Sequence, residues 1–102
     1  MANLSWNVPI KKVTHFCEGH PIISKLSLFG SALSGTLRQD SDIDFLVEFE
    51  TGKTPSLFEL IRLEDELTTI LGRKTDLRTA EELSRYFRNE VLTQAKSLYV
   101  KP

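Results

Sequence analysis

The sequence predicts an α+β fold in which helices pack on a small mixed β-sheet. Segments with the helical period of about 3.6 residues alternate along the chain with segments that have the two-residue period of strands. The chain has 102 residues, enough for one hydrophobic core and too few for two. No repeat, low-complexity tract or linker interrupts it. We therefore expect residues 1–102 to form a single domain.

The N-terminal part of the chain predicts a helix and then a strand. Apolar residues at helical spacing predict a short amphipathic helix over residues 9–18, which Gly19 ends. Pro21 separates this helix from the next element, because a proline disfavours helical backbone in the residue before it. Residues 22–29 are rich in apolar and β-branched side chains and predict a strand that ends at Gly30.

A loop and a second strand follow. Residues 32–35 allow no more than one helical turn, and residues 36–41 are polar and predict a loop. Residues 42–50 alternate in the way expected for a strand with one buried face. The apolar face of this strand consists of Ile43, Phe45, Val47 and Phe49. Its other face begins with two acidic residues, Asp42 and Asp44.

The second half of the chain predicts a long helix, a short strand and two further helices. Leucine and isoleucine recur at helical spacing between Ser56, a residue type typical of an N-cap, and Gly72, a residue type typical of a helix end. Residues 74–78 predict a short strand. A helix over residues 79–87 and a last helix over about residues 88–98 complete the predicted order.

Composition and charge exclude several classes of protein. The chain has 13 basic and 14 acidic residues, and no run of basic residues could follow a phosphate backbone. We therefore expect no direct binding to nucleic acid, which disfavours a polymerase or a tRNA-modifying enzyme. Cys17 is the single cysteine, so neither an intrachain disulfide nor a thiolate metal cluster can form. The first residues do not have the pattern of a signal peptide and no apolar segment has membrane-spanning length, so we expect a cytoplasmic protein.

Three aspartates are the candidate metal ligands and catalytic residues. Asp42 and Asp44 lie two residues apart on a predicted strand, so both carboxylates project from one face. Two negative charges held this close repel each other unless a cation lies between them. Mg²⁺ is commonly held by one or two carboxylates together with substrate phosphates. If the strand that carries Asp76 lies beside these two residues, three carboxylates converge in an arrangement that suits two metal ions.

Gly30 and Ser31 are the candidate phosphate-binding residues. Glycine lets a phosphate approach the backbone closely, and the amides that follow it and the Ser31 hydroxyl can donate hydrogen bonds to an anion. Neither this pair nor an isolated Asp-x-Asp is specific, and for either alone a solvated strand end is the better interpretation. An apolar strand, Gly-Ser, a gap of ten residues, Asp-x-Asp and a distant third aspartate are together far more specific.

The segments from Leu28 to Thr36 and from Asp40 to Val47 resemble the signature of the minimal nucleotidyltransferases of the DNA polymerase beta superfamily. That signature is Gly-Ser, ten residues and then Asp-x-Asp, and this sequence matches it without a gap. The likeness covers nearly the whole chain in element order and includes the strand from Lys74 to Leu77. It implies a polymerase beta-like nucleotidyltransferase fold.

The resemblance also implies a role for each candidate residue. Gly30 and Ser31 would bind the triphosphate. Asp42 and Asp44 would ligate both Mg²⁺ ions, whereas Asp76 would ligate the catalytic ion and help to deprotonate the acceptor.

The implied reaction is Mg²⁺-dependent transfer of AMP from ATP to a hydroxyl of a protein partner. The minimal members of the family are often encoded beside a helical HEPN-domain toxin, a ribonuclease, and act as its antitoxin, some by transferring AMP to a tyrosine of the toxin. Many members have arginines where this chain has Ala32 and Ser34, a difference that bears on the rate and on recognition of the acceptor.

Two other interpretations stay open at this point. The chain could neutralise its partner by occlusion alone, as a binding module that keeps the acids for nucleotide binding or for the fold. The acids could also be a decayed or merely structural site. The sequence leaves the acceptor, the preferred base and the formation of a homo-oligomer open.

Overall fold

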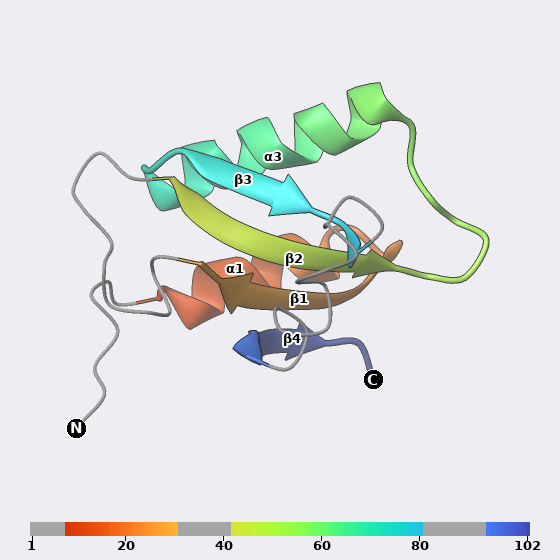
Figure 1. Cartoon of the computed structure of the whole chain (residues 1–102), viewed down its shortest axis with the longest axis horizontal. Helices are drawn as coiled ribbons and strands as arrows, with labels where there is room; N and C mark the ends of the chain where they lie inside the picture. The colour runs from red at the N-terminus through yellow and green to blue at the C-terminus, as the bar shows by residue number, and fades with distance from the viewer. Residues whose placement is uncertain (1–7, 31–41, 81–93) are drawn as a thin grey trace.

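The computed structural model describes residues 8–30, 42–80 and 94–102 (Figure 1). In chain order, these residues form α1 (Ile10–Glu18), β1 (Ile23–Phe29), β2 (Ile43–Phe49), α3 (Leu57–Leu71), β3 (Thr75–Arg78) and β4 (Lys96–Val100). The strands form one sheet in the order β3-β2-β1-β4. β1 is antiparallel to both β2 and β4, whereas β2 and β3 are parallel. The predicted α+β fold with a small mixed sheet is therefore confirmed.

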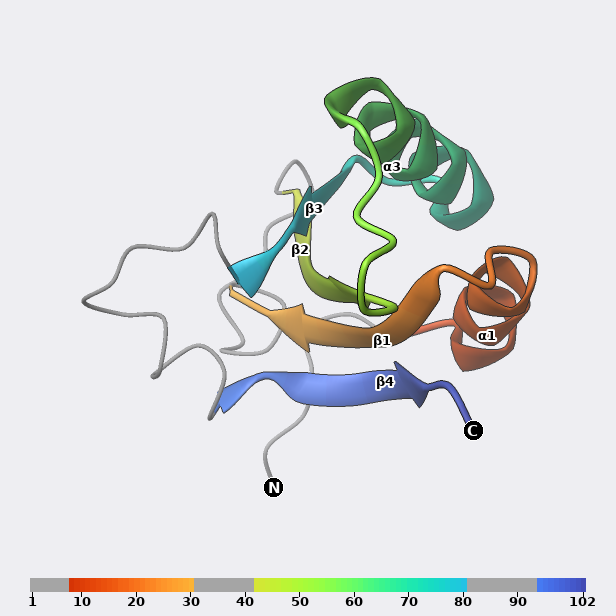
Figure 2. The same cartoon turned by 90° about the vertical axis from the view of Figure 1, so that its right-hand side faces the viewer.

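α1 and α3 cover the same face of the sheet (Figure 2). α1 contributes Val13, Phe16 and Cys17 to the hydrophobic core, and α3 contributes Leu63 and Leu67. The strands contribute Ile23, Leu26, Leu28, Ile43, Phe45, Val47 and Leu77. Burial raises the pKa of the Cys17 thiol to about 12, so this side chain packs as an apolar group.

α3 has the ends that its sequence predicts. The Ser56 hydroxyl accepts a hydrogen bond from the Glu59 amide at 3.2 Å, which satisfies one of the free donors of the first turn. Gly72 follows the helix with a φ of +71°, a conformation that favours glycine, and its amide donates to the Thr68 carbonyl. Within the described ranges, no helix is both long enough and apolar enough to cross a membrane.

The alternation predicted for β2 is present in the structure. Ile43, Phe45 and Val47 are at most 1% exposed and face the helices. Asp44 is half-buried on the other face. Leu46 departs from the pattern, because it is also buried although it lies on the same face as Asp44. The strand therefore separates a core face from a polar face at the end where it begins.

The C-terminal segment corrects one prediction. The helix predicted over residues 88–98 is wrong at its C-terminal end: Gln94 is helical, but Lys96–Val100 form β4. β4 pairs with the edge of β1 that β2 leaves open, with Tyr99 opposite Leu26. Hydrogen bonding to that edge and packing of Leu98 and Tyr99 on the core outweigh the local helical spacing.

Several predicted elements fall outside the described residues. These are the helical turn over residues 32–35, the loop over residues 36–41, and the helix over residues 79–87 beyond Ala80. The first part of the helix predicted over residues 88–98 also lies outside the described residues. These expectations stay predictions.

Candidate active site

Asp44 and Asp76 lie side by side on the polar face of the sheet. β2 and β3 are parallel, and their register places Asp44 opposite Asp76. The residues before and after each acid are buried on the helix-covered face; they are Ile43, Phe45, Thr75 and Leu77. Because successive residues of a strand point to opposite faces, both carboxylates project away from the helices. The parallel pairing thus brings together two acids that are 32 residues apart in the chain.

Asp42 lies one residue before β2 and is half-buried. Its charge reaches Asp44, whose pKa is raised first by burial, then by the negative charge of Asp76 and then by that of Asp42. The positive charge of Arg78 opposes this rise in the Asp44 pKa. The negative charges of both other candidate aspartates therefore act on Asp44.

Gly30 follows β1 and lies against Asp44. The last residue of β1, Phe29, is the partner of Asp44 in the antiparallel pair. Gly30 has a φ of +78°, and a Cβ atom at this position would overlap with Oδ2 of Asp44. The backbone conformation and the nearby carboxylate both favour glycine here. The two halves of the Gly-Ser and Asp-x-Asp motif therefore meet in space, although Ser31 lies outside the described residues and its role stays a prediction.

Arg78 belongs to this site and was not singled out from the sequence. Its Nε and Nη2 atoms donate hydrogen bonds to Oδ2 of Asp76 at 3.1 and 2.9 Å. The two residues are two apart on β3, so they share a face. That spacing is visible in the sequence, and it was a signal that could have identified Arg78.

Glu64 of α3 is the second residue that the sequence analysis missed. Its Oε2 accepts a hydrogen bond from the Leu77 amide at 2.9 Å. Burial raises the pKa of Glu64, the bond from Leu77 lowers it, and the charge of Asp76 and a hydrogen bond with the Asp76 side chain raise it again. No local pattern announces this contact, because it joins a helix to a strand that begins 11 residues later.

The chemistry of the three acids fits a divalent cation. Carboxylate oxygens are ligands that Mg²⁺ prefers, and a cation would relieve the repulsion from Asp76 and Asp42, which raises the Asp44 pKa in addition to burial. As the side chains stand in the described ranges, no three Asp, Glu, His or Cys residues are close enough to enclose a metal ion. Asp76 is instead engaged by Arg78. The backbone register nevertheless makes Asp44 and Asp76 neighbours, and their carboxylates can turn about their side-chain bonds while the strands stay paired.

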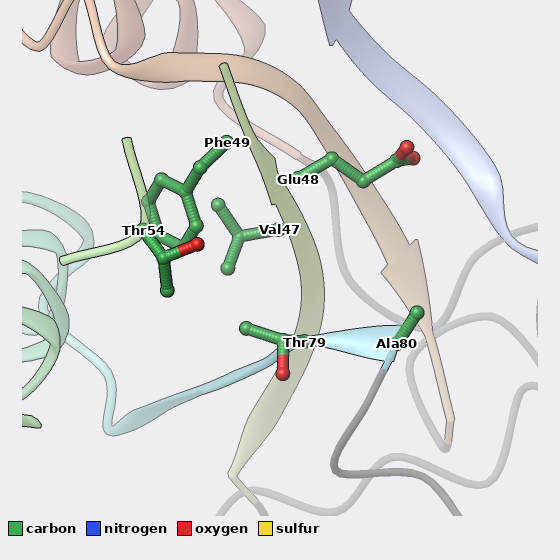
Figure 3. A pocket seen from close by; sticks show the side chains of 6 residues that line it. All are labelled: Val47, Glu48, Phe49, Thr54, Thr79 and Ala80. Carbon is green, nitrogen blue, oxygen red and sulfur yellow. The ribbon is translucent and has the colours of Figure 1, made fainter. Parts of the chain in front are cut away.

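A cavity of about 390 Å³ lies at the other end of β2 (Figure 3). β3 ends at Arg78, so it pairs with β2 only as far as Leu46. Figure 3 shows Val47 and Phe49 pointing to one side of β2 and Glu48 to the other. The lining residues are Val47, Glu48, Phe49, Thr54, Thr79 and Ala80. None of the predicted site residues is among them, so the acids rather than this cavity form the candidate active site.

The chain is similar in sequence to known proteins. The family model described as polymerase beta, nucleotidyltransferase, matches residues 11–102. A candidate protein adenylyltransferase of Methanocaldococcus jannaschii is 37% identical over 73 residues, which cover 72% of this chain and 76% of the relative. The protein adenylyltransferase MntA of Thermococcus cleftensis is 36% identical over 72 residues, 71% of either chain.

A solved structure is similar over most of the fold. It is the crystal structure of a toxin–antitoxin with AMP-PNP, and it superposes with a TM-score of 0.77 at 26% sequence identity. The superposition covers 92% of this chain and 75% of the matched chain. The arrangement of strands and helices is therefore shared with a chain of that complex.

Proposed function

The chain belongs to the polymerase beta nucleotidyltransferase family and is by homology a protein adenylyltransferase, and from this premise we propose that it transfers AMP from ATP to a hydroxyl of a protein partner. The partner we propose is a helical HEPN-type toxin, for which this chain is the antitoxin. In this role, modification of the partner by AMP is what neutralises it.

The placement of Asp44 beside Asp76 is the observation that supports this function most directly. A parallel strand pair sets the two carboxylates on the face of the sheet opposite to α1 and α3. Gly30 lies against Asp44 on the side of β1, and because it is a glycine no side chain lies between them. This face therefore combines negative charge with an open backbone position, as a metal-bound triphosphate requires.

We propose that Asp42, Asp44 and Asp76 hold two Mg²⁺ ions and that Gly30 and Ser31 bind the triphosphate. Bound Mg²⁺ neutralises charge on the phosphates and makes the acceptor hydroxyl more acidic. The chain supplies the carboxylates in a fixed register, so that little rearrangement of the backbone is needed when substrate binds.

The proposed transfer is a single displacement at the α-phosphorus of ATP. The acceptor hydroxyl oxygen forms a bond with the α-phosphorus of ATP, and the bond from that phosphorus to the oxygen bridging the β-phosphate breaks. Pyrophosphate leaves, and the hydroxyl proton passes to the Asp76 carboxylate. Because no bond forms between chain and nucleotide, the residues of the site contribute positioning and charge.

The relatives support ATP as donor and a protein as acceptor. The relative from Thermococcus cleftensis is a protein adenylyltransferase, and it aligns with 71% of this chain. The structurally similar complex is a toxin–antitoxin that contains AMP-PNP, an analogue of ATP. A toxin partner and an adenine nucleotide thus occur together on the same fold.

The decisive experiment replaces Asp42 and Asp44 by Asn. The variant and the wild type are incubated with ATP labelled at the α-phosphate and with a HEPN-type toxin as the proposed partner. We expect transfer of label to fall by at least roughly a hundredfold, since metal binding contributes several kcal/mol to such a reaction. Asp65→Asn, an equivalent change on the exposed side of α3, should transfer label at the wild-type rate. Undiminished transfer by the double variant would remove these acids from the chemistry.

Neutralisation of the partner separates transfer from occlusion. We expect the Asp42→Asn, Asp44→Asn variant to bind the toxin but not to protect cells that express it. Protection equal to that of the wild type would show that occlusion is sufficient, and the transfer would then not be the basis of the antitoxin role.

A further inference from the structure

Arg78 is the last residue of β3 and contacts Asp76 through two of its nitrogen atoms. Nε and Nη2 donate to the same carboxylate oxygen, Oδ2 of Asp76, at 3.1 and 2.9 Å. An arginine side chain stays charged in proteins, so no titration of Arg78 is needed for this contact. Arg78 therefore places a permanent positive charge directly beside one of the three acids.

The position of Arg78 in the sheet puts this charge on the β3 side of the candidate site. Asp76 and Arg78 share the face of β3 on which Asp44 lies in β2. Because the strand order is β3-β2-β1, Gly30 at the end of β1 lies on the opposite side of Asp44. A phosphate chain that starts at Gly30 and extends across Asp44 toward Asp76 would therefore approach the guanidinium of Arg78.

The backbone of Arg78 is fixed, whereas its side chain has room to turn. The register of β2 and β3 pairs Arg78 with Leu46. The Arg78 side chain is 49% exposed. An ion pair this exposed contributes little stability, since water screens it, so the guanidinium can leave Asp76 at small cost. Arg78 can thus change its partner without any change in the sheet.

A bound divalent cation would compete with Arg78 for the same carboxylate. Asp76 is one of the proposed Mg²⁺ ligands, and its Oδ2 already accepts two hydrogen bonds from the guanidinium. Two positive groups on one carboxylate repel each other, so each weakens binding of the other. A phosphate, in contrast, matches the planar fork of arginine, which donates two parallel hydrogen bonds to its oxygens.

The charges of the site also favour a cation beside the nucleotide. Asp42, Asp44 and Asp76 offset most of the positive charge of the two proposed Mg²⁺ ions. The ions and the acids together therefore leave much of the negative charge of ATP unbalanced. A guanidinium held next to Asp76 is placed to balance part of it.

We propose that Arg78 is a nucleotide-binding residue that exchanges its partner, from the Asp76 carboxylate to a phosphate of ATP, when the nucleotide binds. This inference rests on the proposed function, because it concerns the same acids and the same substrate. The ion pair with Asp76 keeps the guanidinium at the site before binding. Its transfer to phosphate then leaves the Asp76 carboxylate available as a metal ligand.

The test compares Arg78→Ala with Arg62→Ala in the full chain without a partner protein. Arg62 is an exposed arginine of α3, on the opposite face of the sheet, so its removal is the matched change of charge. The first readout is binding of Mn²⁺ alone, followed by the electron paramagnetic resonance signal of free Mn²⁺. The second is binding of ATP in the presence of Mg²⁺, measured by isothermal titration calorimetry. Neither readout requires turnover.

We expect Arg78→Ala to change the two affinities in opposite directions. Mn²⁺ alone should bind roughly two- to tenfold more tightly, because a competing positive charge is removed. ATP should bind roughly 10- to 100-fold more weakly, the loss expected for one or two charge-assisted hydrogen bonds. Arg78→Lys should bind ATP with intermediate affinity, since an ammonium keeps the charge but not the planar fork. Arg62→Ala should match the wild type in both measurements.

Three outcomes would overturn the inference. One is wild-type ATP affinity of Arg78→Ala, and another is an equal loss in Arg62→Ala, which would indicate a general effect of charge. The third is unchanged or weaker Mn²⁺ binding by Arg78→Ala, which would show that Arg78 does not compete with the metal for Asp76. If Arg78→Ala does not fold, Arg78→Gln takes its place, because it removes the charge and keeps a polar side chain of similar shape.

Asp44→Asn separates failure of this inference from failure of the proposed function. If Asp44→Asn loses Mn²⁺ and ATP binding while Arg78→Ala behaves as the wild type, the acids form the nucleotide site and only the role of Arg78 is wrong. If Asp44→Asn binds both ligands as the wild type does, the acids are not a metal and nucleotide site, and both proposals are wrong.

Discussion

Within residues 43–47 of β2, the side chains on the two faces of the strand have opposite roles. Ile43, Phe45 and Val47 are almost completely buried and share the hydrophobic core with residues of α1 and α3. Asp44, between the first two of them, is only half-buried and lies beside another carboxylate. Burial of the apolar residues stabilises the fold, whereas partial burial of Asp44 raises its pKa and disfavours its charged form.

This difference shows where the chain accepts a cost in stability. A strand placed only for stability would not set two acids opposite each other across a parallel pair, since like charges that close repel. The core face holds the strands in register, and that register keeps the acids together. Substitutions on the two faces should therefore separate stability from activity.

The largest expected effect on stability comes from the core face. Phe45→Ala should reduce the free energy of unfolding by about 3–5 kcal/mol, because it removes a fully buried ring. Urea denaturation measures this loss, and Phe45→Leu should cost less than Phe45→Ala because it leaves a smaller cavity. Transfer activity per folded molecule of Phe45→Leu should stay at the wild-type level. A stable Phe45→Ala variant would show that the core does not depend on this side chain.

Gly30→Ala should have the next largest effect, and Gly52→Ala is its matched control. Gly30 has a φ of +78° and Gly52 a φ of +77°. Alanine should therefore introduce similar backbone strain at each position, of about 1–3 kcal/mol. The added methyl group would overlap with the Asp44 carboxylate at Gly30, whereas at Gly52 no atom of the described residues lies within 4 Å of it. We expect Gly30→Ala to be the less stable of the two and to lose Mn²⁺ binding. Equal behaviour of the two variants would contradict the close contact between Gly30 and Asp44.

Asp44→Asn should increase stability, in contrast to Phe45→Ala and Gly30→Ala, and the increase should depend on pH. The pKa of Asp44 is raised in the folded chain above its ordinary value of 3.8, so protonation favours the fold. The wild type should gain stability from this group as the pH falls through the folded pKa, and lose that contribution as the pH rises above it. Asp44→Asn should thus be slightly more stable than the wild type near pH 7. Urea denaturation at several pH values should show this advantage shrinking toward pH 4, and an advantage that grows on acidification would refute the sign.

Arg78 should have the smallest effect on stability. Its ion pair with Asp76 is largely exposed, so Arg78→Ala should change the free energy of unfolding by at most about 1 kcal/mol. Because Arg78 lowers the pKa of Asp44, the variant should strengthen the pH dependence described above. Arg78→Lys, which keeps the charge, should not strengthen it. An unchanged pH profile of Arg78→Ala would mean that its charge does not reach Asp44.

Local patterns predicted most of the described fold. Ser56 and Gly72 bound α3 as their residue types indicate, and alternation in β2 placed the apolar residues on the core face. The predicted first helix, first two strands and third strand differ from the observed ones by one residue at their ends. These features depend on contacts within a few residues, which a single sequence displays directly.

Part of the site was visible in the same way. The spacing of Gly30 from Asp42 and Asp44 indicated a phosphate and metal site, and the structure places Gly30 against Asp44. The positions of Arg78 and Glu64 were not predicted. The contact of Arg78 with Asp76 could have been inferred from their spacing of two residues along β3. The contact of Glu64 with Leu77 depends on how α3 lies against the edge of β3.

The sequence by itself determined the helix ends, the two faces of β2 and the residue types available for chemistry. The tertiary structure alone decided that β3 is parallel to β2 in the register that sets Asp76 opposite Asp44, and that Lys96–Val100 add a strand to β1 rather than continue a helix. The physical reason is the range of the interactions. Capping and periodicity act between near neighbours, whereas strand pairing joins distant segments whose gain in hydrogen bonds and burial exceeds the entropy lost in closing the chain between them.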